Sequence, residues 1–298
     1  MTDQYTMQDP TTQYTGPKRK MADEQGGPGL EQDMPIKPDA GEDTYRGSSR
    51  LEGRKALVTG ADSGIGRAVA IAFAREGADV VLSYLPEEEA DAAEVVQLVE
   101  AAGRRAVAVP GDLTSESFCR QLVQTTVDAL GGIDVLANVA GKQQFVEDIA
   151  DLTTEQFDET YKTNVYAMFW LCKAALAHMP AGSTIINTAS LEGYQPAPIL
   201  LDYASTKWAI NGFSKALAQQ VVSKGIRVNV VAPGPVWTPL QVAGGQPKQS
   251  LKEFGSQSPM GRPGQPAEMA PAYVFLASPE SSYVNATTIN ANGGLPTP

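Results

Sequence analysis

The stretch VTGADSGIGRAVAIAFAREGA, residues 58–78, holds the features that decide the fold. A run of apolar residues, 55–59, leads into Gly60, Gly64 and Gly66, spaced G-x-x-x-G-x-G, and an amphipathic pattern follows. Glycines at such a turn permit positive φ and let the backbone approach a pyrophosphate. The helix that begins near Ile65 turns its free N–H groups and positive dipole end toward the anion. An ordinary glycine-rich turn is the alternative, but a strand before and a helix after favour dinucleotide binding.

Short apolar runs recur along the rest of the chain. They show little alternation between apolar and polar residues, which is typical of strands covered by helices on both faces of a parallel sheet. The predicted strands are 55–59, 78–83, 105–110, 133–140, 183–189, 226–232 and 287–291.

Helical patterns lie between these runs. The predicted helices are 65–76, 87–102, 115–130, 155–178 and 205–224, and the first three end just before Gly77, Gly103 and Gly131. Glycine directly after a helix is the usual residue at its C-terminal end. The series predicts an α/β fold with a doubly wound, Rossmann-like parallel sheet in three α/β/α layers. We expect one dinucleotide-binding and catalytic domain, residues 51–298, behind an N-terminal extension.

The composition excludes several classes of protein. The 298 residues contain 23 Lys and Arg against 34 Asp and Glu, a net charge of −11, which is opposite to the charge of a nucleic-acid binder. Cys119 and Cys172 lie far apart without a neighbouring histidine, so we expect neither a disulfide framework nor a metal site. No window approaches the ~18 apolar residues that cross a bilayer, and no secretory signal is visible. We therefore expect a cytoplasmic protein.

Residues 1–50 form a segment of different composition, in which Leu30 and Ile36 are the only Leu, Ile, Val or Phe. Such a segment cannot bury enough apolar surface to offset its own ordering entropy. We expect an extended, partly flexible arm whose first twenty or so residues are loose and whose residues 34–51 dock on another surface.

Three further turns belong at the carboxyl edge of the predicted sheet, where doubly wound folds bind ligands. Asp112 and Leu113 follow the third strand, and we expect adenine beside them. Asn138, Ala140 and Gly141 end the fourth strand, and Ser83 and Tyr84 end the second. These residues and the glycine turn predict one continuous cofactor site.

Tyr203 and Lys207 are four residues apart in a helical pattern and therefore share one face. A phenol has an unperturbed pKa near ~10, and a nearby ammonium favours the phenolate and lowers that pKa. Tyr203 is thereby predicted as a general acid/base for a carbonyl or alcohol. A chance pair on a helix surface is the alternative. Two further polar residues favour the catalytic interpretation: Ser190, at the end of the fifth strand, can hydrogen-bond the substrate oxygen, and Asn164 is an amide among apolar residues that needs partners.

The order of T-G-x-x-x-G-x-G, N-x-A-G, Asn, Ser, Y-x-x-x-K and P-G resembles that of the short-chain dehydrogenases/reductases, over Leu51 to about Gly294. The resemblance implies that Tyr203 is the general acid/base, that Lys207 lowers its pKa and holds the nicotinamide ribose, that Ser190 orients the substrate oxygen, and that Asn164 anchors a water-linked proton relay. It also places Pro233, Gly234, Val236 and Thr238 beside the nicotinamide.

The arm and the sequences GPVWTPLQ and RPGQP resemble a narrower subgroup. Its members are called general stress proteins or glucose and ribitol dehydrogenase homologues, and some are NADP-linked aldehyde reductases. One departure from the family pattern is Val139, where a second Asn is common. We expect a local packing change there and intact cofactor binding.

The choice between NAD and NADP stays open in the sequence. An Asp at the end of the second strand would bind the ribose hydroxyls of NAD, and an Arg nearby would accept the 2′-phosphate of NADP, but the chain has Ser83-Tyr84 there. Asp62 is close enough to meet the ribose, whereas Ser63 and Ser83 can donate to a phosphate. We expect both cofactors to bind, with affinities less than about a thousand-fold apart.

The expected substrate is a small aldehyde, ketone or sugar, interconverted with its alcohol by hydride transfer. Gln143, Glu192, Tyr194 and Trp237 are predicted to line its pocket, under a lid within residues 239–261. The alternatives are a dinucleotide sensor or scaffold without chemistry, and an enzyme whose arm recruits a partner during stress. The resemblance also implies a homo-oligomer, expected to be a tetramer built from helices 155–178 and 205–224 and the last strand.

Overall fold

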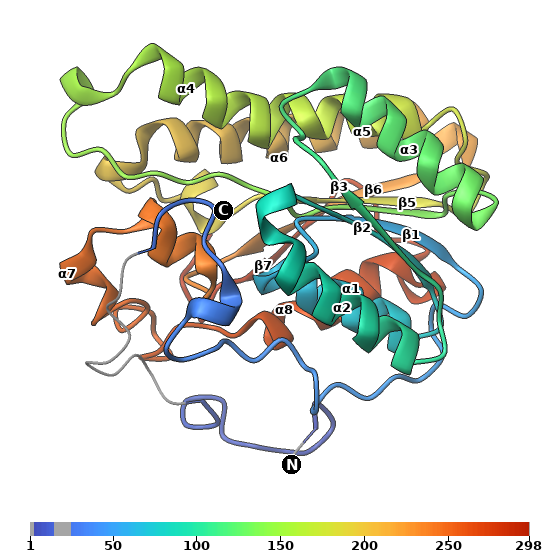
Figure 1. Ribbon diagram of the computed structural model, residues 1–298, viewed down its shortest axis with the longest axis horizontal. Coiled ribbons are helices and arrows are strands. Elements are labelled where there is room, and N and C mark those ends of the chain that lie inside the picture. Colours follow the sequence, from blue (N-terminus) through green and yellow to red (C-terminus); the bar gives the residue numbers. More distant parts are fainter. Residues whose placement is uncertain (1–2, 15–24, 298) are drawn as a thin grey trace.

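The computed structural model describes residues 3–14 and 25–297. Within those residues a single sheet of parallel strands runs in the order β3-β2-β1-β4-β5-β6-β7 (Figure 1). The order reverses between β1 and β4, and the crevice at such a switch point is where this fold class binds ligands. The strands are β1 (Lys55–Thr59), β2 (Asp79–Tyr84), β3 (Ala106–Pro110), β4 (Val135–Asn138), β5 (Thr184–Thr188), β6 (Arg227–Pro233) and β7 (Thr288–Ala291).

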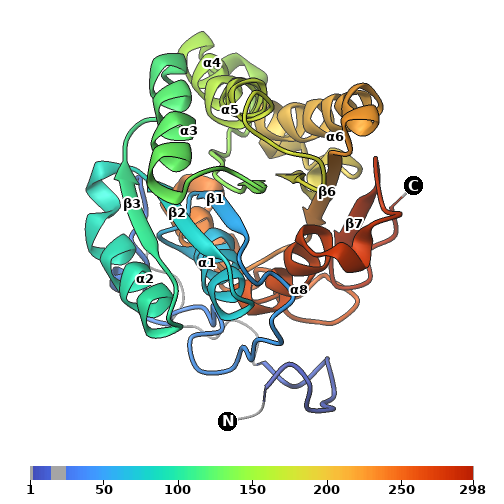
Figure 2. The ribbon, with the colours of Figure 1, turned by 90° about the vertical axis from the view of Figure 1, so that its right-hand side faces the viewer.

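Helices cover both faces of the sheet and make three layers (Figures 1 and 2). On one face lie α1 (Gly64–Arg75), α2 (Glu89–Ala101) and α8 (Pro266–Ala277). On the other lie α3 (Glu116–Leu130), α4 (Thr154–Tyr161), α5 (Ala167–Ala175) and α6 (Leu201–Val221). The short helix α7 (Lys248–Leu251) lies outside these layers, after β6.

Each face of the sheet has its own apolar core, because successive side chains of a strand point to opposite faces. In β1, Ala56 and Val58 pack in the core under α1 and α8, whereas Leu57 packs in the core under α3 and α5. All three side chains are fully buried. This two-sided burial explains why the strands appear in the sequence as continuous apolar runs.

The predicted strands are confirmed, each within two residues at either end. The glycines after the first three helices have positive φ, as expected: Gly77 (+101°), Gly103 (+74°) and Gly131 (+74°). The helix α8 was not predicted, because Pro271 lies inside it and its residues are apolar on nearly every side. It packs against α1 in the first core.

The single helix expected over 155–178 is wrong in detail. It consists of α4, a π-helical turn at Lys162–Tyr166 and α5, which ends at Ala175. The helix predicted from Ser205 begins earlier, at Leu201, so Tyr203 lies in the first turn of α6.

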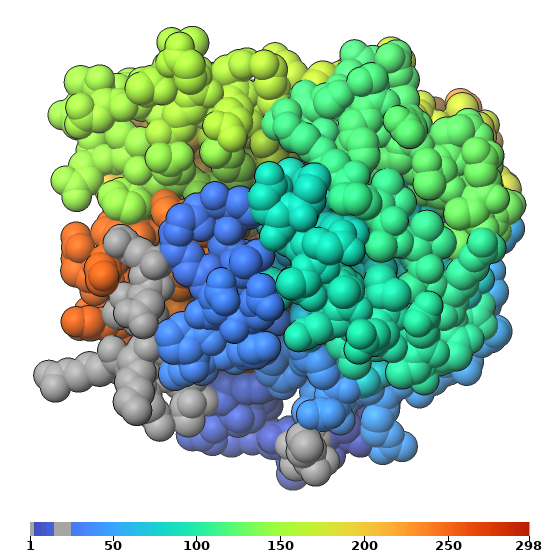
Figure 3. Space-filling model, viewed as in Figure 1, coloured from blue at the N-terminus to red at the C-terminus, as the bar shows by residue number. Residues whose placement is uncertain are grey.

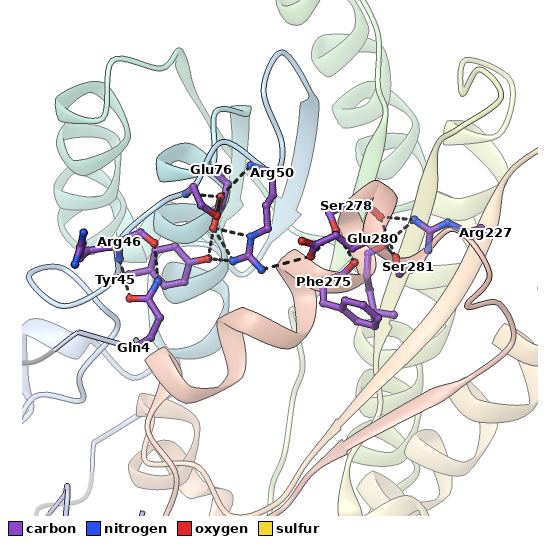
Figure 4. A network of polar contacts seen from close by, with 12 residues as sticks. Gln4, Tyr45, Arg46, Arg50, Glu76, Arg227, Phe275, Ser278, Glu280 and Ser281 are labelled. Carbon is purple, nitrogen blue, oxygen red and sulfur yellow. Dashed lines mark hydrogen bonds and ion pairs between the residues drawn. The ribbon is translucent and has the colours of Figure 1, made fainter. Parts of the chain in front are cut away.

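The arm lies against the body along much of its length (Figure 3). In Figure 4 the Tyr45 hydroxyl donates to the buried Glu76 at the end of α1, at 2.7 Å, and the Arg50 guanidinium binds the same carboxylate at 2.6 Å. The backbone amide of Leu51 donates to the carbonyl oxygen of Glu76. Residues 34–51 are thus docked on their own chain.

The structure differs from the expectation that the first twenty residues are loose. Within residues 3–14, the carbonyl oxygen of Pro10 accepts two hydrogen bonds from the Arg262 guanidinium, and Gln13 donates to Glu268. The rest of that expectation, at residues 1–2 and 15–20, lies outside the described residues.

Candidate active site

A cavity of about 1010 Å³ follows the carboxyl ends of the strands. Its wall combines the turn after β1, the ends of β2 and β3, the turn after β4, the residues after β5, the start of α6 and the segment after β6. The predicted cofactor residues that line it are Gly60, Asp62, Ser63, Gly64, Ile65, Gly66, Ser83, Tyr84, Asp112, Leu113, Ala140, Gly141, Tyr203, Lys207, Pro233, Gly234, Val236 and Thr238.

Asn138 is the exception among the predicted cofactor residues, because it is absent from the wall of this cavity. Its side-chain amide nitrogen donates to Asn187 Oδ1 at 2.8 Å, and its main-chain carbonyl oxygen accepts from the Thr188 hydroxyl at 2.7 Å. Asn138 therefore ties β4 to β5 beneath the cavity, and its prediction as a cofactor contact is corrected to a supporting position.

The turn after β1 has the shape that the glycine pattern predicts. Gly60 and Gly64 adopt φ of +59° and +51°, which is costly for residues with a Cβ. A Cβ on Gly66 would lie 1.8 Å from the carbonyl oxygen of Gly60, so only glycine allows the first turn of α1 to pack on this loop. The loop brings the N-terminus of α1 to the cavity, where free amides favour an anion.

Polar atoms without partners mark the end of the cavity nearest β2. Asp62 is 2% exposed and Ser83 is 1% exposed, and Asp62 Oδ2 and Ser83 Oγ have no hydrogen-bond partner among the residues that the structure describes. Buried polar groups are normally paired. Both residues line the cavity, so their free atoms fit a ligand rich in hydroxyl groups, such as a ribose.

Tyr203 and Lys207 lie together inside the cavity wall. Tyr203 is 7% exposed, and Ser190, the residue predicted to accompany it, lines the same cavity and is close enough to lower the pKa of the Tyr203 hydroxyl. Lys207 is 3% exposed, lies over the Tyr203 ring at 5.2 Å from its centroid, and donates to the carbonyl oxygen of Thr188 at 2.9 Å. Three of the four predicted catalytic side chains therefore line one wall.

The direction of the Tyr203 pKa differs from the sequence expectation. Burial raises the pKa of Tyr203, with a smaller contribution from the charge of Glu192, whereas the hydrogen bond with Ser190 lowers it. Burial also lowers the pKa of Lys207 to about 8. Burial thus favours the neutral form of both groups. For Tyr203 this effect is larger than the lowering of the pKa that was expected from the nearby Lys207 ammonium.

Asn164 lies in the π-helical turn between α4 and α5. Its Oδ1 accepts from the backbone amide of Lys142 at 2.7 Å, and its amide nitrogen donates to the carbonyl oxygen of Lys142 and to Thr206 Oγ1. A π-helical turn inserted between α-helical segments often occurs at a functional site. The turn after β4 is thereby fixed to the start of α6, the two segments that carry Gly141 and Lys207.

Of the predicted substrate residues, Gln143 lines the cavity, with its amide bonded to the carbonyl oxygen of Gly245 at 2.6 Å. Glu192 and Tyr194 follow Ser190 but are absent from the wall. The Glu192 carboxylate accepts from the backbone amide of Ala197, and the Tyr194 hydroxyl donates to Asn211. These local hydrogen bonds hold both side chains away from the cavity.

Trp237 is also absent from the wall, and its prediction as a substrate contact is wrong in this structure. It is 1% exposed, packs with Met34, Val242 and Leu251, and donates its indole N–H to the carbonyl oxygen of Ile36. Its role is to bind the arm to the segment after β6.

The sequence did not predict that the arm itself lines the cavity. Gln25, Gly27, Pro28 and Gly29 form part of the wall, together with residues 239–241, 243 and 244 of the predicted lid. The amide of Gln25 donates to the carbonyl oxygen of Val242 at 2.9 Å. No local pattern signals this contact, since it joins segments more than two hundred residues apart. The other unpredicted wall residues include Leu85, Glu88, Thr114, Lys142 and Lys162.

Comparison with known proteins agrees with this geometry. Residues 60–296 match the family model described as "Enoyl-(Acyl carrier protein) reductase". The chain is 58% identical to "Uncharacterized oxidoreductase YghA" of Escherichia coli, over 97% of this chain and 98% of the relative. It is 44% identical to "NADPH-dependent aldehyde reductase 1, chloroplastic" of Arabidopsis thaliana, over 90% of this chain and 94% of the relative.

A solved structure is similar as well. It is a short-chain dehydrogenase from Burkholderia cenocepacia in complex with NADP, with a TM-score of 0.76 and 34% identity, covering 82% of this chain and 98% of that one. The glycine turn, the parallel sheet and these matches lead to one conclusion: the chain belongs to the short-chain dehydrogenases/reductases and is an NAD(P)-dependent oxidoreductase.

Proposed function

We propose that the protein interconverts a small carbonyl compound, an aldehyde, ketone or sugar, and the corresponding alcohol, with Tyr203 as the general acid/base. The observation that carries the proposal is the position of Tyr203, which is buried and lies with Ser190 and Lys207 on the wall of the cavity that the glycine turn also lines. A substrate oxygen between the two hydroxyls would meet a proton donor and a second hydrogen bond.

The residues present fit a dinucleotide. The glycine turn and the N-terminus of α1 would hold the pyrophosphate, the free atoms of Asp62 and Ser83 the adenosine ribose, and Lys207 the nicotinamide ribose. When bound, the nicotinamide supplies or accepts the hydride. Thr238 and Gly234 line the part of the cavity after β6, where the ring would lie.

Tyr203 and Lys207 would carry out the proton transfer to and from the substrate oxygen. With its pKa raised by burial, Tyr203 keeps its proton at neutral pH and can donate it to a carbonyl oxygen as negative charge develops there. The Lys207 ammonium over the ring stabilises the phenolate that remains. In the reverse direction the phenolate takes the proton of the alcohol.

Asn164 and Lys142 are the proposed start of the path by which that proton is replaced. A Cβ on Gly141 would lie 3.5 Å from Asn164 Oδ1 and 3.6 Å from Lys207 Nζ, so both polar groups approach the same glycine. Water that bridges these atoms would link Lys207 to the turn after β4.

The proposed substrate class rests on two supports. The name of the Arabidopsis relative gives an aldehyde as its substrate, and Gln143 and Gln144 put amide groups on the wall beside the predicted lid. Amides favour an oxygen-bearing substrate over an apolar one. We therefore expect short aldehydes and hydroxylated carbonyl compounds to be turned over faster than apolar ketones of equal size.

The test is the consumption of NADH and NADPH by the purified protein against short aldehydes, ketones and sugars. Turnover of at least one group supports the proposal and identifies the substrate class. Tight dinucleotide binding without turnover of any compound, in either direction, would instead favour the hypothesis that the protein is a dinucleotide sensor or scaffold without chemistry.

A homotetramer is also part of the proposal. The face made by α4, α5 and α6 exposes large apolar side chains, which is unusual for a surface without a partner. They are Phe157, Tyr166, Phe169, Leu201 and Trp208. Sedimentation at micromolar concentration should give four times the 31.6 kDa chain mass, and Phe169→Glu should give smaller species; a wild-type monomer would contradict it.

The proposed location is the cytoplasm. Cys119 and Cys172 are both free and buried, as is usual in a reducing compartment. Among the residues that the structure describes, no helix is long and apolar enough to cross a membrane.

A further inference from the structure

Residues 25–36 of the arm form a strap over the cavity. Its first part is a loop closed by the Gln25 side chain, whose amide nitrogen donates to the carbonyl oxygen of Leu30 at 3.0 Å. The Gln25 Oε1 accepts from the backbone amide of Leu30 at 2.7 Å. Four residues of this loop line the cavity: Gln25, Gly27, Pro28 and Gly29. The loop therefore forms part of the wall as one braced unit.

The middle of the strap is fixed to the side of the body that carries α1 and α2. The backbone amides of Glu31 and Gln32 both donate to the Asp91 carboxylate on α2, at 2.6 and 3.1 Å. The Glu31 carboxylate accepts from the backbone amide of Gly64, the first residue of α1, at 2.8 Å. Both carboxylates are buried, so movement of this part would leave buried polar groups unpaired.

The predicted lid meets the loop of the strap from the opposite side. The backbone amide of Gln25 donates to the carbonyl oxygen of Val242 at 2.9 Å. A Cβ on Gly29 would lie 2.9 Å from Ala243 Cβ and 3.0 Å from the carbonyl oxygen of Pro239, so the two segments leave no space between them. In Figure 3 the arm (blue) lies on the surface between the lid (orange) and α2 (teal). Strap and lid thus form one continuous wall.

An apolar cluster holds the strap and the lid together further along. Met34 of the strap is 4% exposed and packs with Trp237 and with Val242 and Leu251 of the lid. The Trp237 indole N–H donates to the carbonyl oxygen of Ile36 at 3.0 Å. None of these five residues lines the cavity. Separation of lid and strap would return the apolar side chains to water, so the cluster stabilises the closed wall without touching a bound molecule.

The other side of the lid is tied to the turn after β4. The Gln143 side-chain amide donates to the carbonyl oxygen of Gly245 at 2.6 Å, and the backbone amide of Phe145 donates to the carbonyl oxygen of Gly244 at 3.1 Å. Lid and strap together therefore close the cavity from the turn after β4 across to α2.

We propose that the strap acts as a gate: the lid must separate from the strap before a dinucleotide can enter or leave the cavity. Opening of a lid limits product release in many enzymes. The apolar contacts that keep this lid closed involve residues outside the cavity, so a bound dinucleotide need not change them. They stabilise the closed cavity with or without dinucleotide, and they therefore slow entry and exit alike with little effect on affinity. The inference rests on dinucleotide binding in this cavity and goes beyond the substrate class proposed above.

The experiment is stopped-flow fluorescence of the full chain with NADH and with NADPH. Association gives kon, displacement by excess NAD⁺ or NADP⁺ gives koff, and equilibrium titration gives Kd. In Met34→Ala the lid loses a buried contact, and truncation of a buried methionine is sufficient to shift such an opening equilibrium at least about tenfold. Both kon and koff should rise at least about tenfold, while Kd stays within about threefold of wild type.

Tyr45→Phe is the matched control, because it loosens the arm at Glu76, outside the cavity wall and the apolar cluster. Both of its rate constants should stay within about twofold of wild type. If Met34→Ala does not fold, Trp237→Phe removes the hydrogen bond to Ile36 and should raise both rate constants about fivefold.

The outcomes separate the gate from the proposed function. A rise in koff alone, with a matching loss of affinity, would overturn the gate and make the strap a direct contact of the dinucleotide. Unchanged rate constants in both variants would also overturn it. Exchange that follows the predicted pattern without turnover of any substrate would overturn the proposed carbonyl chemistry alone, and failure of both dinucleotides to bind would overturn both.

Discussion

Replacement of Glu76 by glutamine tests how the arm is held to the body. The Glu76 side chain is fully buried, and it accepts hydrogen bonds from the Tyr45 hydroxyl, the backbone amides of Ser48 and Arg50, and the Arg50 guanidinium (Figure 4). These contacts lower the pKa of Glu76 from 4.5 to about 2 although burial opposes them. Glutamine keeps the shape but replaces an accepting oxygen by a donor and leaves the Arg50 guanidinium with the more distant and more exposed Glu280 carboxylate, at 3.7 Å, as its ion-pair partner.

The magnitude follows from the two pKa values. At ~1.36 kcal/mol per pKa unit, the difference corresponds to about 3 kcal/mol of unfolding free energy at pH 7. Because the folded pKa is the lower one, this stability is present above pH ~4.5 and is lost as the pH falls through about 2. By pH 3.5 the contribution should decrease to about 2 kcal/mol.

The assay is urea unfolding of wild type and Glu76→Gln at pH 7 and at pH 3.5, with the protein concentration held fixed. The variant should be about 3 kcal/mol less stable at pH 7, and the gap should narrow in acid. Tyr45→Phe is the control, since it removes two hydrogen bonds, one to Glu76 and one from Arg50, but no charge, and should cost about 2 kcal/mol at either pH. A gap below about 1 kcal/mol at pH 7, or one that does not narrow, would refute this account of the arm.

Further predictions concern the cavity. Because the pKa of Lys207 is lowered to about 8, its positive charge is lost as the pH rises through that value, so kcat/KM for carbonyl reduction should fall above about pH 8; a flat profile to pH 10 would contradict a need for the charge. A Cβ on Gly29 would lie 2.9 Å from Ala243 Cβ, so Gly29→Ala should weaken dinucleotide binding several-fold, whereas Gly26→Ala, with nothing within 4 Å, should not; equal affinities would show that the arm does not shape the cavity. Asn164→Leu should destabilise the fold by about 1–3 kcal/mol for each group left unpaired, measured by urea unfolding, and an unchanged midpoint would contradict that role.

Much of the fold could be predicted from the sequence because local signals agree with the final packing. Strands buried on both faces appear as apolar runs, and Gly131 ends its helix with the positive φ expected of a glycine there. The helix α8 escaped prediction because Pro271 is a helix breaker in most settings, and its packing against α1 overrides that preference.

The site could be predicted in part for a similar reason. Tyr203 and Lys207 share a helix face, so their spacing was enough to bring them together. Trp237 follows the P-G turn and carries no signal for which side it faces, and the arm's Ile36 decides that by accepting its indole N–H. The spacing of Tyr203 and Lys207 could not predict that the pKa of Tyr203 is raised, because its burial depends on every element packed around the hydroxyl.

The most direct test of the central claim compares Tyr203→Phe with Tyr194→Phe in NADH- and NADPH-dependent reduction of the best substrate found. Both variants lose one phenol near Ser190, but the Tyr194 hydroxyl bonds Asn211 and is absent from the cavity wall. We predict that Tyr203→Phe binds dinucleotide like wild type while its kcat falls by about 10²–10⁴-fold, and that Tyr194→Phe stays within a few-fold of wild type. A Tyr203→Phe variant that turns over like wild type would contradict the assignment of Tyr203 as the proton donor.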